Sequence, residues 1–177
     1  MRRLLLVVVL LGAAACGGGQ PGGDPAVTAA ASMTVTSTAF REDGTIPRQY
    51  TCDGAGTSPP LAWSGTPTAA KALAIVVDDP DAPSGTFTHW VLLDLDPKTT
   101  SLSEGTTPQD AKQALNSAGK PSYYGPCPPS GTHHYRFTVY ALSAPTGLAA
   151  GARLDAALKA IGSKNIGHGR LTGLYAR

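Results

Sequence analysis

Two short proline-rich segments hold most of the residues in this chain that could do chemistry. The first, DDPDAPSG at residues 78–85, carries three carboxylates, and the second, YGPCPPSGTHHY at residues 124–135, carries two neighbouring histidines. Proline fixes its own φ and pushes the preceding residue out of the helical region, so both segments should be stiff turns. The candidate binding residues in and between them are Asp79, Asp81, His89, His133 and Tyr135.

Imidazoles beside carboxylates could form a small polar pocket for an oxyanion. His133 and Tyr135 lie two residues apart at a predicted strand, so their side chains should share one face. An imidazole donates N–H bonds and gains charge near neutral pH, and a neighbouring carboxylate fixes its tautomer and raises its pKa. The alternative is that the aspartates are solvated in a surface turn and the histidines are half-buried side chains with ordinary hydrogen bonds.

Common catalytic and metal-binding templates are missing from the sequence. There is no G-x-S-x-G elbow, no P-loop and no H-E-x-x-H helix. A calcium loop counted from Asp79 would place Pro83, Ser84 and Trp90 where an oxygen ligand, glycine and glutamate are needed. Zinc could in principle use the aspartate and two histidines, but no ligand pair has diagnostic spacing, so we expect neither a metal nor a cofactor.

The elements that must position these residues are mostly strands. Strong strand patterns cover residues 71–78, 89–96 and 134–142, and weaker ones cover 34–39 and 171–175. An amphipathic helix is expected over 153–161, with Gly162 as its stop signal, and a short exposed helical turn over 109–115. The body is therefore predicted to be mainly β, a single domain with one or two peripheral helices.

Composition supports one small domain and argues against a nucleic-acid binder. The chain has 177 residues, of which 42% are hydrophobic and 15% charged, and its 21 glycines and 15 prolines disfavour a helical bundle. Its formal charge is +2, and without Arg2 and Arg3 the remaining 12 basic residues balance 12 acidic ones. Such a neutral domain lacks the basic surface that phosphate backbones require.

The N-terminus has the features of an export signal. Arg2 and Arg3 precede an apolar run over 4–11 and the small residues of GAAAC, which predicts a signal peptide over 1–15. The apolar run is too short to span a bilayer, which needs about 20 residues. The stretch resembles a bacterial lipoprotein leader, in which Cys16 would be lipidated; the alternative is ordinary cleavage that leaves a free cysteine.

These features divide the chain into three parts and predict where it resides. Residues 16–32 are expected to be a flexible tether and 33–177 the folded domain. The protein is expected to be exported and held at the cell membrane by lipid, facing the periplasm or the exterior. Cys52 and Cys127 are then an even pair in an oxidising compartment, joined in a disulfide or present as two buried thiols.

The two proline-rich segments also carry a family resemblance. DPDAPSG followed by HW, and then GPCPPSGTHHY, resemble the phosphatidylethanolamine-binding protein family, in particular its bacterial Raf kinase inhibitor-like branch. FREDGTIPRQYTCDGAGTSPPLAW, NSAGKPSYYGPCPP and LTGLYAR agree with it, so the similarity runs from Thr34 to Arg177. The resemblance implies an antiparallel, Greek-key-like β-sandwich with one pocket for phosphate-like groups, including phosphoethanolamine head groups.

The resemblance assigns roles to the candidate residues of this sequence. By position it makes ligand-binding residues of Asp79, Asp81, His89, Pro128, His133 and Tyr135. Two departures stand out. His134 replaces an arginine, which should weaken a structural ion pair, and Lys164 stands near the position of a C-terminal histidine, which puts the pocket rim in question.

Three functions follow from the candidate residues and the resemblance. The first is a non-enzymatic, envelope-anchored binding protein for a small anionic or phosphorylated ligand, whose affinity should rise as pH drops through about 6.5. A zwitterion with phosphate and ammonium groups would suit both the histidines and Asp79. The second is a protein-interaction module that inhibits a kinase or protease, with a partner still to be identified. The third, an Asp/His hydrolase, is least favoured because no activated nucleophile is evident.

Overall fold

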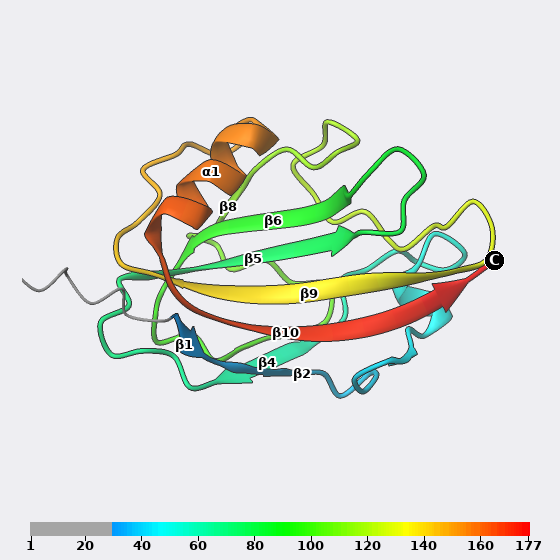
Figure 1. The fold of residues 1–177 in the computed structure, drawn as a ribbon, viewed down its shortest axis with the longest axis horizontal. Coiled ribbons are helices and arrows are strands. Elements are labelled where there is room, and N and C mark those ends of the chain that lie inside the picture. The colour runs from blue at the N-terminus through cyan, green and yellow to red at the C-terminus, as the bar shows by residue number, and fades with distance from the viewer. Residues whose placement is uncertain (1–29) are drawn as a thin grey trace, which may run out of the picture.

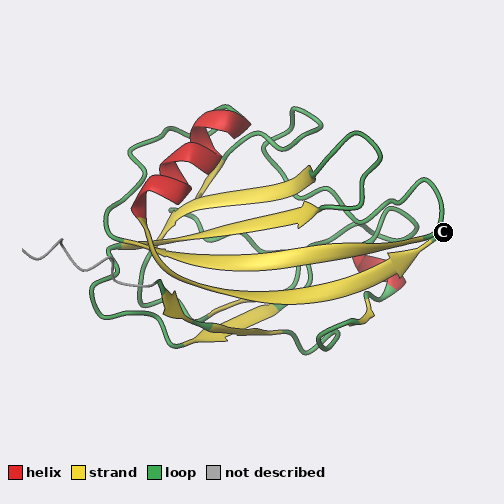
Figure 2. Ribbon diagram, in the orientation of Figure 1, coloured by secondary structure: helices red, strands yellow, loops and turns green. Residues whose placement is uncertain are grey.

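The computed structural model describes residues 30–177 of the chain; the predicted signal peptide and Cys16 lie outside the described residues. Within this range strands dominate, with one α-helix and one short 3₁₀ turn (Figures 1 and 2). In chain order the elements are β1 Ala31–Ser32, β2 Thr34–Thr36, β3 Gly44–Thr45, η1 Arg48–Tyr50, β4 Leu61–Ser64, β5 Ala72–Asp79, β6 Phe87–Leu95, β7 Ser101–Leu102, β8 Lys112–Gln113, β9 Thr132–Leu142, α1 Leu154–Lys164 and β10 Asn165–Ala176.

The strands form a large and a small sheet. The large sheet has seven strands in the order β1-β10-β9-β5-β6-β8, with β3 also paired to β10, and the small sheet has the order β2-β4-β7. The mainly β prediction is confirmed, but the sheets are not purely antiparallel. Both β1 and β3 run parallel to β10, each through a pairing of two residues. The Greek-key-like sandwich stays a prediction.

The large sheet buries both of its faces in its central part. Leu73, Ile75 and Val77 of β5 enter the main core, which also contains Val35 and Trp63 from the small sheet. The alternate residues of β5 enter a second core with Ala157 and Ile161 of α1. Figure 1 shows α1 lying over one end of the sheet. This double burial explains why β5 is apolar at nearly every position.

Two local predictions near the helix and β8 are wrong. The helix continues past Gly162 to Lys164, because Gly162 faces open space with no steric contact while the neighbouring Ile161 stays buried against the sheet. The expected helical turn over 109–115 is a turn followed by β8, because the backbone there pairs with the otherwise open side of β6. Both outcomes depend on partners far away in the sequence.

The last strand is much longer than its pattern predicted. β10 pairs with β9 along nearly its whole length, from Asn165 to Ala176. Glycines hide it from a search for alternating side chains, yet the close packing needs them: a Cβ on Gly169 would lie 2.3 Å from the carbonyl oxygen of Met33. The glycines that allow this close packing also weaken the alternating pattern by which a strand is recognised in the sequence.

Strand pairing among the described residues includes two positions before Met33, where the folded domain was predicted to begin. Ala31 and Ser32 already pair with Gly167 and His168 of β10. Within residues 30–177, no helix combines the length and apolar character needed to cross a membrane.

Candidate functional site

A small cavity lies at the end of the large sheet where β5 finishes and β9 starts. Its volume is about 180 Å³. It is lined by Asp79, Ala82, Pro83, Phe87, His89, Tyr124, Cys127, Pro129 and His133. Both proline-rich segments contribute to its wall, so the structure brings the two predicted loops together around one space.

Asp79 and His133 form a buried pair in this cavity. Asp79 ends β5 and His133 is the second residue of β9, and both are buried. His133 Nδ1 lies 2.7 Å from Asp79 Oδ2. A carboxylate oxygen only accepts, so Nδ1 carries the proton and the ring orientation is fixed. Asp79 Oδ1 accepts the backbone N–H of Asp81 at 2.8 Å, which holds the carboxylate from its other side.

A β-bulge brings His89 to the same cavity. Val77 of β5 pairs with Trp90, but the next residue, Asp78, pairs with Thr88, which leaves His89 as an extra residue in β6. A bulge of this kind redirects a side chain that strict alternation would send to the other face. Trp90 consequently enters the main core while its neighbour His89 lines the cavity.

The buried position of His89 controls its charge. Its Nδ1 donates to the carbonyl of Tyr124 at 2.7 Å, so the neutral ring keeps Nε2 as an acceptor. Burial lowers the pKa of His89, although the Tyr124 carbonyl and the charge of Asp79 partly oppose the shift. Protonation of His89 therefore requires a pH below about 6.5, its ordinary pKa.

Tyr135 and Pro128 support the cavity and do not line it. The Tyr135 ring is fully buried, with centroid distances of 5.2 Å to His89 and 6.4 Å to His133. Burial, followed by the charge of Asp79, raises the pKa of its hydroxyl, which has no hydrogen-bond partner among residues 30–177. Pro128 is buried, and the next residue, Pro129, forms the wall.

Asp81 also stands outside the cavity lining. Its Oδ2 accepts the backbone N–H of His134 at 2.8 Å and approaches the His134 ring Nδ1 at 2.7 Å. The backbone bond first, and the ring bond second, lower the pKa of Asp81. His134, which stands where the family resemblance expects an arginine, holds this carboxylate through a backbone donor and an imidazole; a weaker ion pair than arginine would form stays a prediction. Asp81 thereby ties the first loop to the start of β9.

Lys164 is too distant to affect the rim. It ends α1, and the residue after it, Asn165, pairs with Leu142 at the far end of β9. The cavity lies at the opposite end of that strand, near His133.

Sequence reasoning missed two aromatic residues of the cavity. Phe87 opposes Asp79 across the β5–β6 pairing, and Tyr124 opens the second proline-rich segment. Phe87 lay outside the strand predicted over 89–96, and the bulge at His89 breaks the alternation that would relate the two side chains. Tyr124 had only its place in the proline-rich segment as a signal.

A disulfide joins Cys52 to Cys127, with the Cα atoms 5.4 Å apart. It links the segment after η1 to the second loop, and Cys127 lines the cavity. Across residues 30–177 there is no group of three or more His, Cys, Asp or Glu side chains placed to hold a metal ion.

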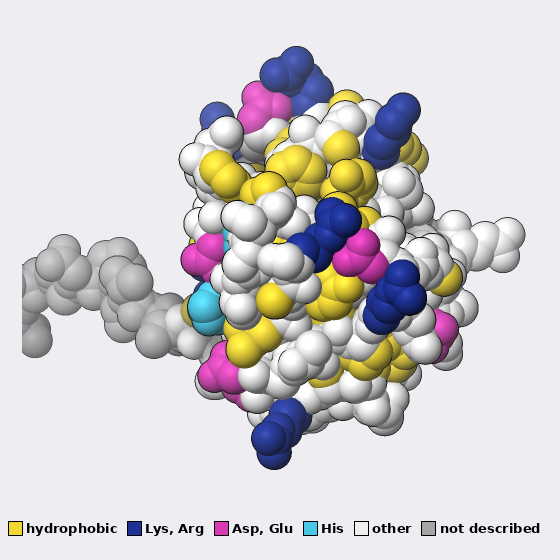
Figure 3. Space-filling model, turned by 90° about the vertical axis from the view of Figure 1, so that its right-hand side faces the viewer, with side chains coloured by type: hydrophobic (Ala, Val, Ile, Leu, Met, Phe, Trp, Pro, Cys, Tyr) yellow, Lys and Arg dark blue, Asp and Glu magenta, His cyan; other side chains and the backbone are white. Residues whose placement is uncertain are grey.

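The surroundings of the cavity carry mixed charge. Among residues 30–177, no Lys or Arg side chain lines the cavity. Figure 3 views the molecule from the end that carries the C-terminus in Figure 1, and its basic side chains are scattered among acidic and apolar ones.

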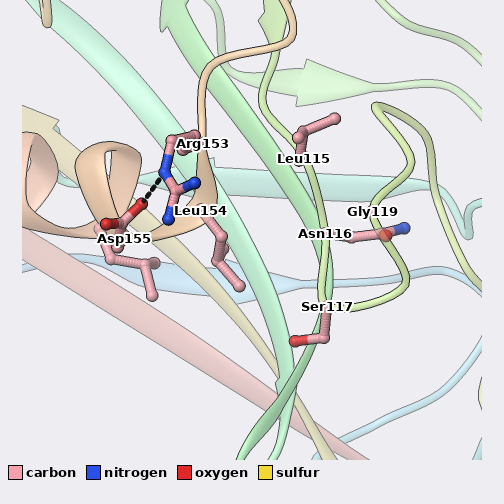
Figure 4. Close-up of a pocket in the computed structure, with 8 residues that line it drawn as sticks. Leu115, Asn116, Ser117, Gly119, Arg153, Leu154 and Asp155 are labelled. Atoms are coloured by element: carbon pink, nitrogen blue, oxygen red, sulfur yellow. Dashed lines mark hydrogen bonds and ion pairs between the residues drawn. The ribbon is translucent and has the colours of Figure 1, made fainter.

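A second depression beside α1 is larger but offers less chemistry. It measures about 610 Å³ and lies between the first turn of α1 and the segment 115–119 (Figure 4). Arg153 is paired with Asp155, and Asn116 is occupied by backbone groups of its own loop. The cavity with the two histidines is therefore the candidate site.

Comparison with known proteins fixes the family. Residues 36–176 match the family model described as phosphatidylethanolamine-binding protein. The chain belongs to the phosphatidylethanolamine-binding protein family. Among solved members of the family, it resembles the homologue CT736 of Chlamydia trachomatis, with 38% identity, a TM-score of 0.77, and coverage of 82% of this chain and 98% of that one. It also resembles E. coli YbcL, with 28% identity, a TM-score of 0.78 and the same coverages.

Two curated relatives show the breadth of the family. A UPF0098 protein of Methanothermobacter thermautotrophicus is 45% identical over 150 residues, which cover 82% of this chain and 99% of the relative. The Mycobacterium tuberculosis protein named "Putative lipoprotein LppC" is 43% identical over 149 residues, which cover 83% of this chain and 74% of the relative.

Proposed function

We propose that this member of the family is a non-enzymatic, envelope-anchored binding protein whose cavity takes phosphate or a phosphorylated head group. One observation carries the proposal. Three strands and two loops bring the imidazoles of His89 and His133 to a single cavity of about 180 Å³. The carboxylate of Asp79 holds the ring of His133 in place. A cavity of this size suits a small head group.

The ring nitrogens left over from these hydrogen bonds define how an anion would bind. Nδ1 of His133 is engaged by Asp79 and Nδ1 of His89 by the Tyr124 carbonyl, so each ring has only Nε2 for a ligand. Nε2 donates to a phosphate oxygen once the ring is protonated. Because the pKa of His89 is lowered, phosphate affinity should rise mainly below pH 6.5, at a more acidic pH than the sequence indicated.

The same cavity supports a binding role over catalysis. Among residues 30–177 its lining contains no serine, threonine or lysine, its cysteine, Cys127, is held in a disulfide, and the carboxylate of Asp79 is engaged by two hydrogen bonds. An enzyme that works through a covalent intermediate needs an activated nucleophile next to its base. Neither a hydrolase nor an inhibitor of kinases or proteases is favoured by a specific contact in the described residues.

Anchoring rests on the N-terminal sequence and on one relative. Cys16 follows the predicted signal peptide, and the mycobacterial relative carries a lipoprotein name. We expect radiolabelled fatty acid to be incorporated into the wild-type chain and not into a Cys16→Ser variant. Equal labelling of both proteins would refute lipidation at Cys16.

Calorimetric titration tests the binding function directly. Inorganic phosphate should bind more tightly at about pH 5.5 than at about pH 7.5, and His133→Ala should lose at least about tenfold in affinity. His168→Ala is the matched control, because His168 is exposed on β10 away from the cavity. No binding at either pH, or equal binding by His133→Ala and wild type, would overturn the proposal.

A further inference from the structure

Three aromatic rings stand together in the wall of the cavity. Phe87 lies with its ring centroid 4.8 Å from His89 and 5.7 Å from Tyr124, and His89 and Tyr124 are 5.8 Å apart. The ring planes are tilted against one another by 48° to 60°. The three rings are therefore inclined to one another and do not form a flat stack.

The cavity has a polar floor and an aromatic rim. Asp79, His89 and His133 are buried, at 3%, 3% and 7% exposure. Phe87 is half-buried. Tyr124 is 42% exposed, the highest exposed fraction among the large hydrophobic side chains within residues 30–177. The remaining outer wall includes two prolines and an alanine. A ligand bound through phosphate at the floor would thus place its other end against aromatic and aliphatic groups.

This rim suits a particular kind of cation. A cation is attracted to an aromatic face within about 6 Å of the ring centroid, and rings whose centroids are 5.7 Å apart can both contact one such group. A primary ammonium has three N–H donors and needs acceptors to replace its water. A quaternary ammonium has no N–H to satisfy, so an aromatic and proline wall costs it little.

Asp79, the only carboxylate among the described lining residues, attracts a cation of either kind. Asp79 supplies a negative charge to the cavity, but each of its oxygens already accepts a hydrogen bond from the protein. Its charge attracts a quaternary and a primary ammonium alike, so the choice between them falls to the aromatic and proline wall. No Lys or Arg of the lining opposes that attraction.

We propose that the cavity selects phosphate esters of a quaternary ammonium alcohol, the chemistry of phosphocholine, over esters of a primary amine such as phosphoethanolamine. Phe87 and Tyr124 are the specificity-determining residues. The inference rests on the proposed function in one respect, because the phosphate is assigned to the histidine floor.

Calorimetric titrations with phosphocholine, phosphoethanolamine and inorganic phosphate test this selection. Phosphocholine should bind about tenfold more tightly than phosphoethanolamine, because an aromatic and proline wall does not replace the hydrogen bonds to water that a primary ammonium loses. Dihexanoylphosphatidylcholine, used below its critical micelle concentration, tests whether the phosphocholine group is recognised as part of a lipid or as a free ester. If it binds as well as phosphocholine, the ligand is a lipid head group, and if it does not, the ligand is the free ester; both results agree with the shared chemistry.

Variants of Tyr124 separate the ring from the backbone. The Tyr124 backbone holds His89 through its carbonyl, so a side-chain substitution leaves that hydrogen bond in place. Tyr124→Leu should reduce the phosphocholine-to-phosphoethanolamine affinity ratio to about threefold or less, while Tyr124→Phe, which keeps the ring, should retain the wild-type ratio. Phe87→Leu is a second, independent variant with the same expected loss.

The outcomes test the selection of phosphocholine separately from the proposed binding of phosphate. Equal affinity of wild type for the two esters, with inorganic phosphate still bound, overturns the selection and leaves the anion site standing. Phosphocholine binding that depends on Tyr124 without any binding of inorganic phosphate supports the aromatic rim and overturns the phosphate floor. Binding of none of the three compounds overturns both.

Discussion

The hydroxyl of Tyr135 offers a direct test of the packing beneath the cavity. This group is buried without a hydrogen-bond partner among residues 30–177, although its ring contacts both cavity histidines. A buried polar group that makes no hydrogen bond costs roughly 1–3 kcal/mol, because its interaction with water is lost on folding. Tyr135→Phe removes the hydroxyl and keeps the ring, so it should raise the free energy of unfolding.

We expect a gain at the lower end of that range, about 1 kcal/mol, since the deleted oxygen leaves a small void. For a domain of this size the melting temperature should rise by about 2–4 °C. Urea denaturation with the disulfide intact measures the free energy, and a thermal scan in the same buffer measures the melting temperature.

Tyr123→Phe is the matched control for this measurement. The hydroxyl of Tyr123 donates to the carbonyl of Tyr50 at 3.1 Å, so its removal should lower the free energy of unfolding by about 1 kcal/mol. The two substitutions are chemically identical and should act in opposite directions. If Tyr135→Phe destabilises the protein as much as Tyr123→Phe does, the hydroxyl of Tyr135 is satisfied and the reasoning is refuted.

Further predictions concern pH, the disulfide and a crowded glycine. Because the pKa of His89 is lowered by folding, the unfolded chain takes up a proton near pH 6.5 and the folded chain only at lower pH. The free energy of unfolding should therefore fall as the pH drops from about 6.5 through the lowered pKa. In urea denaturation at several pH values, a His89→Gln variant should lose part of this pH dependence. An unchanged slope of the unfolding free energy against pH would contradict the role given to His89. Reducing the Cys52–Cys127 disulfide, which spans 75 residues, should cost about 4 kcal/mol by the chain-entropy model, measured by urea denaturation with and without dithiothreitol; no change would contradict the model. Gly169→Ala should destabilise the fold by about 1–3 kcal/mol, since its Cβ would lie 2.3 Å from a backbone oxygen, whereas Gly162→Ala in the open helix should stabilise it by about 0.5–1 kcal/mol. Equal effects of these two substitutions on the melting temperature would disprove the proposed role of close packing.

Much of the scaffold could be predicted from local sequence. The apolar residues of β5 identified a strand buried on both faces, and the spacing of Leu154, Ala157 and Ile161 identified a helix with one buried face. These predictions succeeded because the signal lies in neighbouring residues of one element. The two proline-rich loops were found for the same reason, since proline restricts the backbone wherever it occurs.

The sequence by itself determined which residue types stand near the site, and only the tertiary structure decided which of them face the cavity. His89 lines it because a bulge forms where β6 pairs with β5, and Tyr135 lies beneath it because β9 fills the core there. Pro129 takes the place expected of Pro128, and Tyr124 joins through the fold of its loop. The direction of a side chain depends on strand register and on packing with distant segments, and neither is encoded in the spacing of nearby residues.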